Sequence, residues 1–216
     1  DDQISEFPDE ALAIHISMPG MFASNKGNLK VQVTITDDDD GLDDNMTYYS
    51  KLFGSHSSEG DEFGSSSDFV QDPDVIIIGS EMFSEPHDTK MVERVGTAYV
   101  FMNSLGQWYQ SAILTPFSPE KQPNTFFGQS VSLTKMHQNN DLIAIVGAPG
   151  QIKAYVYLYN SSIGEWIEES ILVPFNESYV HVEHNFAGRG AVKVYGNVAF
   201  IGAPGLEAVF IYRRVV

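Results

Sequence analysis

The chain has 216 residues, of which 43% are hydrophobic and 12% aromatic, so it can bury a substantial core as a globular protein. Its 29 acidic and 12 basic residues give a formal net charge of -17, which repels phosphate backbones and anionic lipids and argues against nucleic-acid binding and membrane-surface binding. No stretch reaches the roughly 18 apolar residues needed to span a bilayer. The absence of cysteine excludes disulfides and thiolate chemistry. Because the chain begins with Asp1 and not Met, we interpret it as a mature chain or an excised piece.

Four apolar runs, each ending on a turn of small residues, recur along the chain. They cover residues 12–20, 75–82, 142–150 and 197–205. Their β-branched content and short length favour strands over helices. The turns recur with an average period of about 62 residues, which is too long for helical solenoids and typical of a four-stranded propeller blade with long loops.

The remaining predicted elements keep the same period. An alternating strand follows each turn, at 29–35, 97–102, 154–159 and 208–212. After the first three of these, an aromatic-rich strand is predicted at 46–53, 108–117 and 166–175. Loops then lead to strands that open with Phe63-Gly64, Phe127-Gly128 and the looser Phe186-Ala187. Helical period is nowhere sustained, so the sequence predicts an all-β chain.

The predicted strands group into repeats at 1–62, 63–126, 127–185 and 186–216, which we expect to form one structural domain. The first lacks its opening strand and the last lacks its closing strand, so the chain holds about three and a half four-stranded blades. A single small sheet cannot bury both of its faces, so neighbouring sheets must stack. The open ends are expected to be covered by another chain or by more of the same polypeptide, because uncovered edges aggregate.

The motif residues have a recognisable pattern. They are Phe63, Gly64, Phe127, Gly128, Gly147, Ala148, Pro149, Gly202, Ala203 and Pro204. This pattern resembles the FG-GAP repeat family, whose blades build integrin α-subunit heads and many secreted or surface proteins. The resemblance covers nearly the whole chain, but in the first half Ser17-Met18-Pro19 and Gly79-Ser80-Glu81 replace Gly-Ala-Pro. It implies a β-propeller segment in which the motif residues shape the blade and perform no chemistry.

Calcium is the one cofactor that the resemblance raises. Family blades often hold Ca²⁺ in a D-x-D-x-D-G loop, but the corresponding connections here lack that pattern, so those sites are not carried over. A separate acidic loop has Asp38, Asp40 and Asp44 around Gly41, with the near-alternate spacing of oxygen ligands that Ca²⁺ accepts. The same crowded carboxylates also fit a solvated turn, so the sequence leaves both interpretations open and requires no cofactor.

Other candidate sites have weaker support. His181 and His184 flank a carboxylate but fall in a predicted loop, where loop chemistry competes with metal binding. The loop 54–60 carries Ser and His without the strand-turn-helix setting of a nucleophile. Gly188-Arg189-Gly190 precedes a strand, so it is no phosphate cradle. Trp108 and Trp166 occupy equivalent repeat positions, which favours a structural role over sugar stacking. We therefore expect no enzyme activity.

Three N-x-S/T sequons, at Asn45, Asn160 and Asn176, exceed the roughly one that chance supplies and favour N-glycosylation in an extracellular or cell-surface setting. The leading functional hypothesis is a glycosylated structural or adhesive β-propeller module. Its partners would be other protein chains or further blades. Two alternatives stay open: a ligand-recognition head that binds a glycan or protein, and an accessory domain of a secreted hydrolase.

Overall fold

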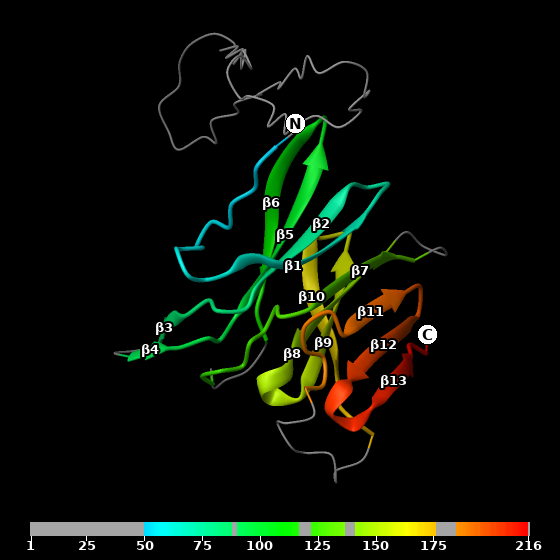
Figure 1. Ribbon diagram of the computed structural model, residues 1–216. Coiled ribbons are helices and arrows are strands. Elements are labelled where there is room, and N and C mark those ends of the chain that lie inside the picture. Colours follow the sequence, from blue (N-terminus) through cyan, green and yellow to red (C-terminus); the bar gives the residue numbers. More distant parts are fainter. Residues whose placement is uncertain (1–49, 88–89, 117–121, 137–140, 176–184, 216) are drawn as a thin grey trace, which may run out of the picture. The chain divides into compact units, whose positions relative to one another are not determined.

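The computed structural model describes residues 50–215, apart from 88–89, 117–121, 137–140 and 176–184 (Figure 1). Residues Phe53–Val216 form one compact unit, separate from Asp1–Leu52. The predicted strands at 12–20 and 29–35, and most of the strand at 46–53, fall outside the described residues. The three large sheets all belong to the unit that begins at Phe53.

The first sheet has four antiparallel strands that lie side by side in chain order. They are β1 (Phe63–Val70), β2 (Val75–Ser80), β5 (Thr97–Ser104) and β6 (Gln107–Leu114). The two central strands are buried along most of their length, because sheet neighbours flank them and other segments cover both faces. All three runs predicted between 75 and 117 are therefore strands, and the last of them ends early, at Leu114.

The second sheet repeats this arrangement. Its strands, again in chain order, are β7 (Val131–Lys135), β8 (Leu142–Ala148), β9 (Lys153–Asn160) and β10 (Glu165–Leu172). The register shift between its last two strands leaves Glu169 unpaired, and the register shift in the first sheet leaves Ser111 unpaired at the equivalent place. Because the two β-bulges lie at matching positions, the two sheets are repeats of the same structural unit.

The third sheet has three strands among the described residues. They are β11 (Val192–Tyr195), β12 (Val198–Ala203) and β13 (Ala208–Arg213), in that spatial order. They correspond to the first three strands of the other sheets, as the sequence predicts for the partial last repeat. The described part of the chain thus confirms an all-β fold made of antiparallel sheets of three and four strands, none of which closes on itself.

The Gly-Ala-Pro turns become short 3-10 helices, η1 (Pro149–Gln151) and η4 (Pro204–Leu206). Proline suits the first position of such a turn because its φ is already set and no N–H is needed there. In the first sheet Glu81 replaces that proline. An additional hairpin follows, β3 (Glu85–His87) and β4 (Lys90–Val92), which extends away from the sheet in Figure 1 and which the sequence patterns did not predict.

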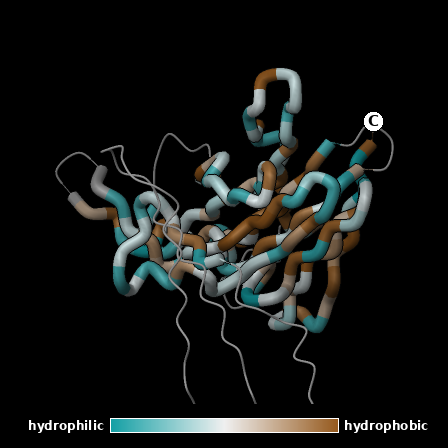
Figure 2. Tube along the Cα trace, turned by 90° about the horizontal axis from the view of Figure 1, so that it is seen from above, coloured by the Kyte–Doolittle hydropathy of each residue, from teal (hydrophilic) through white to brown (hydrophobic). Residues whose placement is uncertain are grey.

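Two apolar clusters hold the three sheets together. One joins the first and second sheets and includes Val75, Ile77, Leu133, Val146 and Tyr155. The other joins the second and third sheets through residues such as Ile145, Val156, Val194 and Ile201. Figure 2 shows hydrophobic stretches running through the central part of the described chain. The middle sheet is thus covered on both faces, which is what stacking of repeats requires.

Candidate functional site

The sheets meet most closely where a glycine lies near the end of the second strand of each repeat. A side chain on Gly79 would lie under 3.0 Å from the carbonyl oxygen of Gly128, and one on Gly147 would lie equally close to the carbonyl oxygen of Ala187. The backbone of one repeat therefore touches the start of the next, which only a residue without a side chain allows. Gly128 itself has a φ of +90, which favours glycine.

Serine hydroxyls secure these close approaches. Ser66, three residues after Phe63, donates a hydrogen bond to the carbonyl oxygen of Gly128 at 2.7 Å. Ser130, three residues after Phe127, donates to the carbonyl oxygen of Ala187 at 2.8 Å. The first two described repeats thus use the same serine position to bind the backbone of the following repeat. These serines were not predicted as site residues, although their constant distance from the Phe-Gly motif is visible in the sequence.

A polar cluster joins the first strands of all three sheets at equivalent positions. Asp68 Oδ2 accepts hydrogen bonds from Ser132 Oγ, from Leu133 N and from Lys193 Nζ, each at 2.8 Å. Ser132 Oγ in turn accepts a hydrogen bond from Val194 N at 3.0 Å. Burial alone would raise the pKa of Asp68, but these donors outweigh it and hold the pKa below its ordinary value. The carboxylate is therefore a fixed structural acceptor.

Tyrosines of the third strands also join neighbouring sheets, by hydrogen bonds to the backbone that follows the fourth strand of the preceding sheet. Tyr157 in β9 donates to the carbonyl oxygen of Thr115, just after β6, at 2.9 Å. Tyr212 in β13 donates to the carbonyl oxygen of Val173, just after β10, at 2.5 Å. Burial is the main cause that raises the pKa of both phenols, that of Tyr212 to about 12, so they remain donors at neutral pH.

The third sheet lacks the serine and the acceptor side chain that form these hydrogen bonds between sheets in the first two repeats. Ala191 occupies the place of Ser66 and Ser130, and Lys193, a donor without acceptor atoms, occupies the place of Asp68 and Ser132. A side chain on Gly202 would meet only Ala191, its nearest atom being 3.1 Å away. The polar connections between sheets therefore run from the first described sheet to the third and stop there.

The apolar positions, in contrast, continue into the third sheet. Ala98 and Ala154 are fully buried beneath the next sheet, but the equivalent Val209 is 63% exposed. Val100 and Val156 are likewise buried, but the equivalent Ile211 is 67% exposed. The outer face of the third sheet, formed by Val198, Phe200, Val209 and Ile211, is hereafter the open face. It is the principal candidate site of the described residues.

A charged cluster lies where the first and third sheets approach each other. Glu81 is buried and forms an ion pair with Arg189, which also lies 3.4 Å from Glu62. The other oxygen of Glu81, Oε2, has no hydrogen-bond partner. Burial raises the pKa of Glu81, Glu62 adds to the rise, and Gln129 and Arg189 act in the opposite direction. Arg189 thus binds two carboxylates, those of Glu62 and Glu81.

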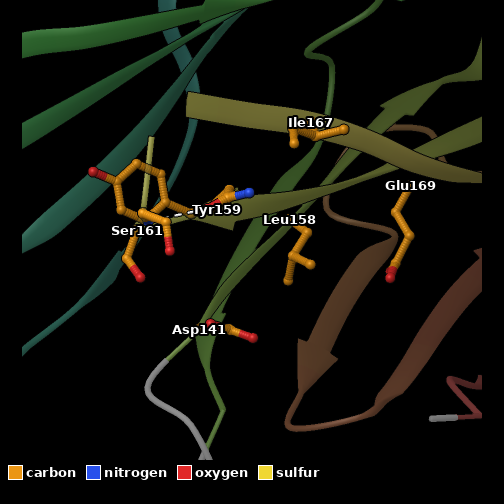
Figure 3. Close-up of a pocket in the computed structure, with 8 residues that line it drawn as sticks. Asp141, Leu158, Tyr159, Ser161, Ile167 and Glu169 are labelled. Atoms are coloured by element: carbon orange, nitrogen blue, oxygen red, sulfur yellow. Dashed lines mark hydrogen bonds between the residues drawn. The ribbon is translucent and has the colours of Figure 1, made fainter. Parts of the chain in front are cut away.

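A shallow depression of about 340 Å³ lies beside the turn between β9 and β10. Figure 3 shows Leu158 in the middle of this depression, with Ile167, Glu169 and Asp141 around it. Asn160, the one sequon residue that the structure describes, also lines it. Its Oδ1 accepts a hydrogen bond from Ser162 N at 3.0 Å, which places the sequon in a turn.

Most other predicted site residues fall outside the described residues. This holds for the candidate calcium ligands Asp38, Asp40 and Asp44, for the sequon residues Asn45 and Asn176, and for the imidazoles of His181 and His184. Among residues that are described, no group of three or more His, Asp or Glu side chains could hold a metal ion. Calcium binding at the acidic loop therefore stays a prediction.

The described members of the weaker candidates have structural roles. Ser55 Oγ lies 3.0 Å from His56 Nδ1, but both residues are exposed and Ser55 is bound twice by Gln110 of β6. This contact anchors the loop to the sheet. Trp166 packs with Tyr159 at a ring separation of 5.4 Å against the first apolar cluster, and Trp108 contacts Phe69.

No helix within the described residues is long and apolar enough to cross a membrane. A scan against protein-family models found no match, and a search of curated proteins found no similar sequence.

Proposed function

We propose that the chain is a non-catalytic protein-binding module, a segment of an FG-GAP-type β-propeller that assembles with a further sheet of the same repeat through its open face. The proposal rests on one comparison between equivalent positions. At the four open-face positions, residues that are buried under the following sheet in the first two repeats have apolar counterparts in the third, where they meet solvent.

The exposed residues form a continuous surface. In the third sheet Phe200 lies directly opposite Ile211, and Val209, two residues before Ile211 on β13, has its side chain on the same outer face. Side chains of this size each gain about 1.5–3 kcal/mol when fully buried, and contiguous apolar patches on soluble proteins commonly mark interaction sites. Another sheet of this repeat is the occupant whose shape fits, because such a sheet already covers the equivalent residues twice in this chain.

The proposal includes an extracellular or cell-surface location with N-linked glycans. Asn160 supports it, because the sequon forms a turn at the end of β9, away from the core of the sheet. Peptide mapping of protein secreted from a eukaryotic cell is the check. We expect a glycan on Asn160, and a bare asparagine in every molecule would contradict this part of the proposal.

Sedimentation velocity over a range of concentrations tests the assembly. We expect the chain to associate through the open face and Ile211→Lys to remain monomeric, because a lysine there would have to be desolvated in the interface. Ile163→Lys is the matched control: Ile163 is 58% exposed in the turn after β9 and should not affect association. A wild-type chain that stays monomeric at all concentrations would overturn the proposal.

A further inference from the structure

The outer edge of β13 has no neighbouring strand in the described part of the chain. In the other two sheets the equivalent edges, those of β5 and β9, are each paired with a fourth strand. Those fourth strands, β6 and β10, share the pattern of a tryptophan followed five and six residues later by Ile and Leu. The pattern comprises Trp108 with Ile113 and Leu114, and Trp166 with Ile171 and Leu172.

The fourth strand of the second sheet covers a defined part of the first sheet. Trp166 and Tyr159 both pack against the first apolar cluster, whose members include Met102 and Leu114. Met102 pairs with Val75, and Leu158 pairs with Ile143 in the same way, so Leu158 is the counterpart of Met102 in the next sheet. By analogy with Trp166, a tryptophan on a fourth strand of the third sheet would face the second sheet, and the counterpart of Met102 on that face is Leu158.

The depression in Figure 3 is located at this place. Leu158 and Ile167 supply its apolar lining, and Asp141, Glu169 and the turn residues around Asn160 complete it. Arg214 takes the position that Tyr159 has in the second sheet, six residues after the start of the third strand. It forms a bidentate ion pair with Glu169, at 2.6 and 2.9 Å, and so borders the depression without filling it.

We propose that the free edge of β13 and the depression at Leu158 and Ile167 together bind an extended segment of a partner polypeptide. The segment adds to the third sheet as a fourth strand, pairs its backbone with β13 and places an aromatic side chain in the depression. Its recognition pattern is that of β6 and β10, a tryptophan with Ile-Leu five residues on. This inference rests on the proposed repeat assembly but concerns a different surface from the open face.

The test uses a fluorescently labelled peptide with the sequence of residues 165–175, which contains Trp166, Ile171 and Leu172. Anisotropy measures its binding to the full chain, and hydrogen exchange locates it. We expect saturable binding, new protection confined to β13 and to the turn residues 160–162 that line the depression, and at least tenfold weaker binding when alanine replaces the peptide's tryptophan. Equal binding of the alanine peptide, or protection elsewhere, would overturn the inference.

Two chain variants separate this site from the open face. Ile167→Asp should weaken peptide binding at least tenfold, because Ile167 lines the depression, and Ile163→Asp should not, because Ile163 lies outside it. Ile211→Lys should abolish self-association and leave peptide binding unchanged, since the Ile211 side chain belongs to the open face. Self-association without peptide binding would overturn only the fourth-strand inference.

Discussion

Glycine positions decide how closely the repeats stack. Gly147 lies on a fully buried strand, and its missing side chain leaves room for the carbonyl oxygen of Ala187 in the next sheet. The third-sheet counterpart, Gly202, faces only Ala191. A glycine at this repeat position is therefore required for close packing only where another sheet follows.

Gly147→Ala should destabilise the fold by about 2 kcal/mol or more, because the added carbon overlaps backbone that cannot move without separating two sheets. Gly202→Ala is the matched control and should cost less. Urea unfolding of both variants provides the comparison. Equal losses in the two variants would contradict the close approach of Gly147 to the following sheet.

The lowered pKa of Asp68 predicts how the inter-sheet cluster responds to acid. A carboxyl whose folded pKa lies below its unfolded value of about 3.9 stabilises the fold above that value, and the contribution is lost as the pH falls through the folded pKa. Wild-type protein should therefore lose stability below about pH 4 more steeply than Asp68→Asn. Thermal unfolding between pH 2 and pH 7 measures this, and parallel pH profiles would contradict it.

Glu81 predicts the opposite pH dependence. Its folded pKa is raised, so its contribution is fully favourable below its unfolded pKa of about 4.3 and is lost as the pH rises through the folded pKa. Glu81→Gln mimics the protonated acid and leaves Arg189 its contact with Glu62. The stability of this variant relative to wild type should increase from pH 4 to pH 8. A constant or falling difference would refute the raised pKa.

At the scale of elements, strand existence was predictable because apolar alternation and Gly or Pro boundaries are local signals. The run at 142–150 became β8 and η1 on that basis. The hairpin β3 and β4 was missed because its strands are short and carry no apolar period. The depression at Leu158 could not be predicted from the sequence either, because it lies beside an edge of the third sheet that has no neighbouring strand among the described residues.

The tyrosines of the third strands were predicted as strand residues, but their role in joining sheets was not, because the acceptor lies on another repeat. Tyr157→Phe removes the bond to Thr115 and should cost about 1 kcal/mol. Tyr212→Phe removes the hydrogen bond to the carbonyl oxygen of Val173 and should lower the free energy of unfolding by a similar amount. Denaturant unfolding of both variants tests this, and unchanged midpoints would indicate that the phenols do not join the sheets.

At the scale of the whole molecule, the described part of the chain is organised by repetition of one interface between sheets. The first two described sheets carry both its polar and its apolar parts, and the third retains only the apolar part. The period in the sequence predicted four repeats, of which the first falls mostly outside the described residues. It could not predict that the polar contacts between sheets end at Ala191 and Lys193. Nothing in the sequence marks these two residues as unusual, and their significance is clear only when the three sheets are compared position by position.

Thiol labelling of three single-cysteine variants tests the stacked repeats most directly, because the chain has no cysteine of its own. The positions are the equivalent residues Ala98, Ala154 and Val209, which are 0%, 0% and 63% exposed. In dilute native protein, cysteine at 209 should react rapidly and cysteines at 98 and 154 only on unfolding. Raising the protein concentration should slow the reaction at 209. Rapid labelling at 98 or 154 in the folded protein would contradict the stacked arrangement, and reactivity at 209 that is independent of concentration would contradict assembly through the open face.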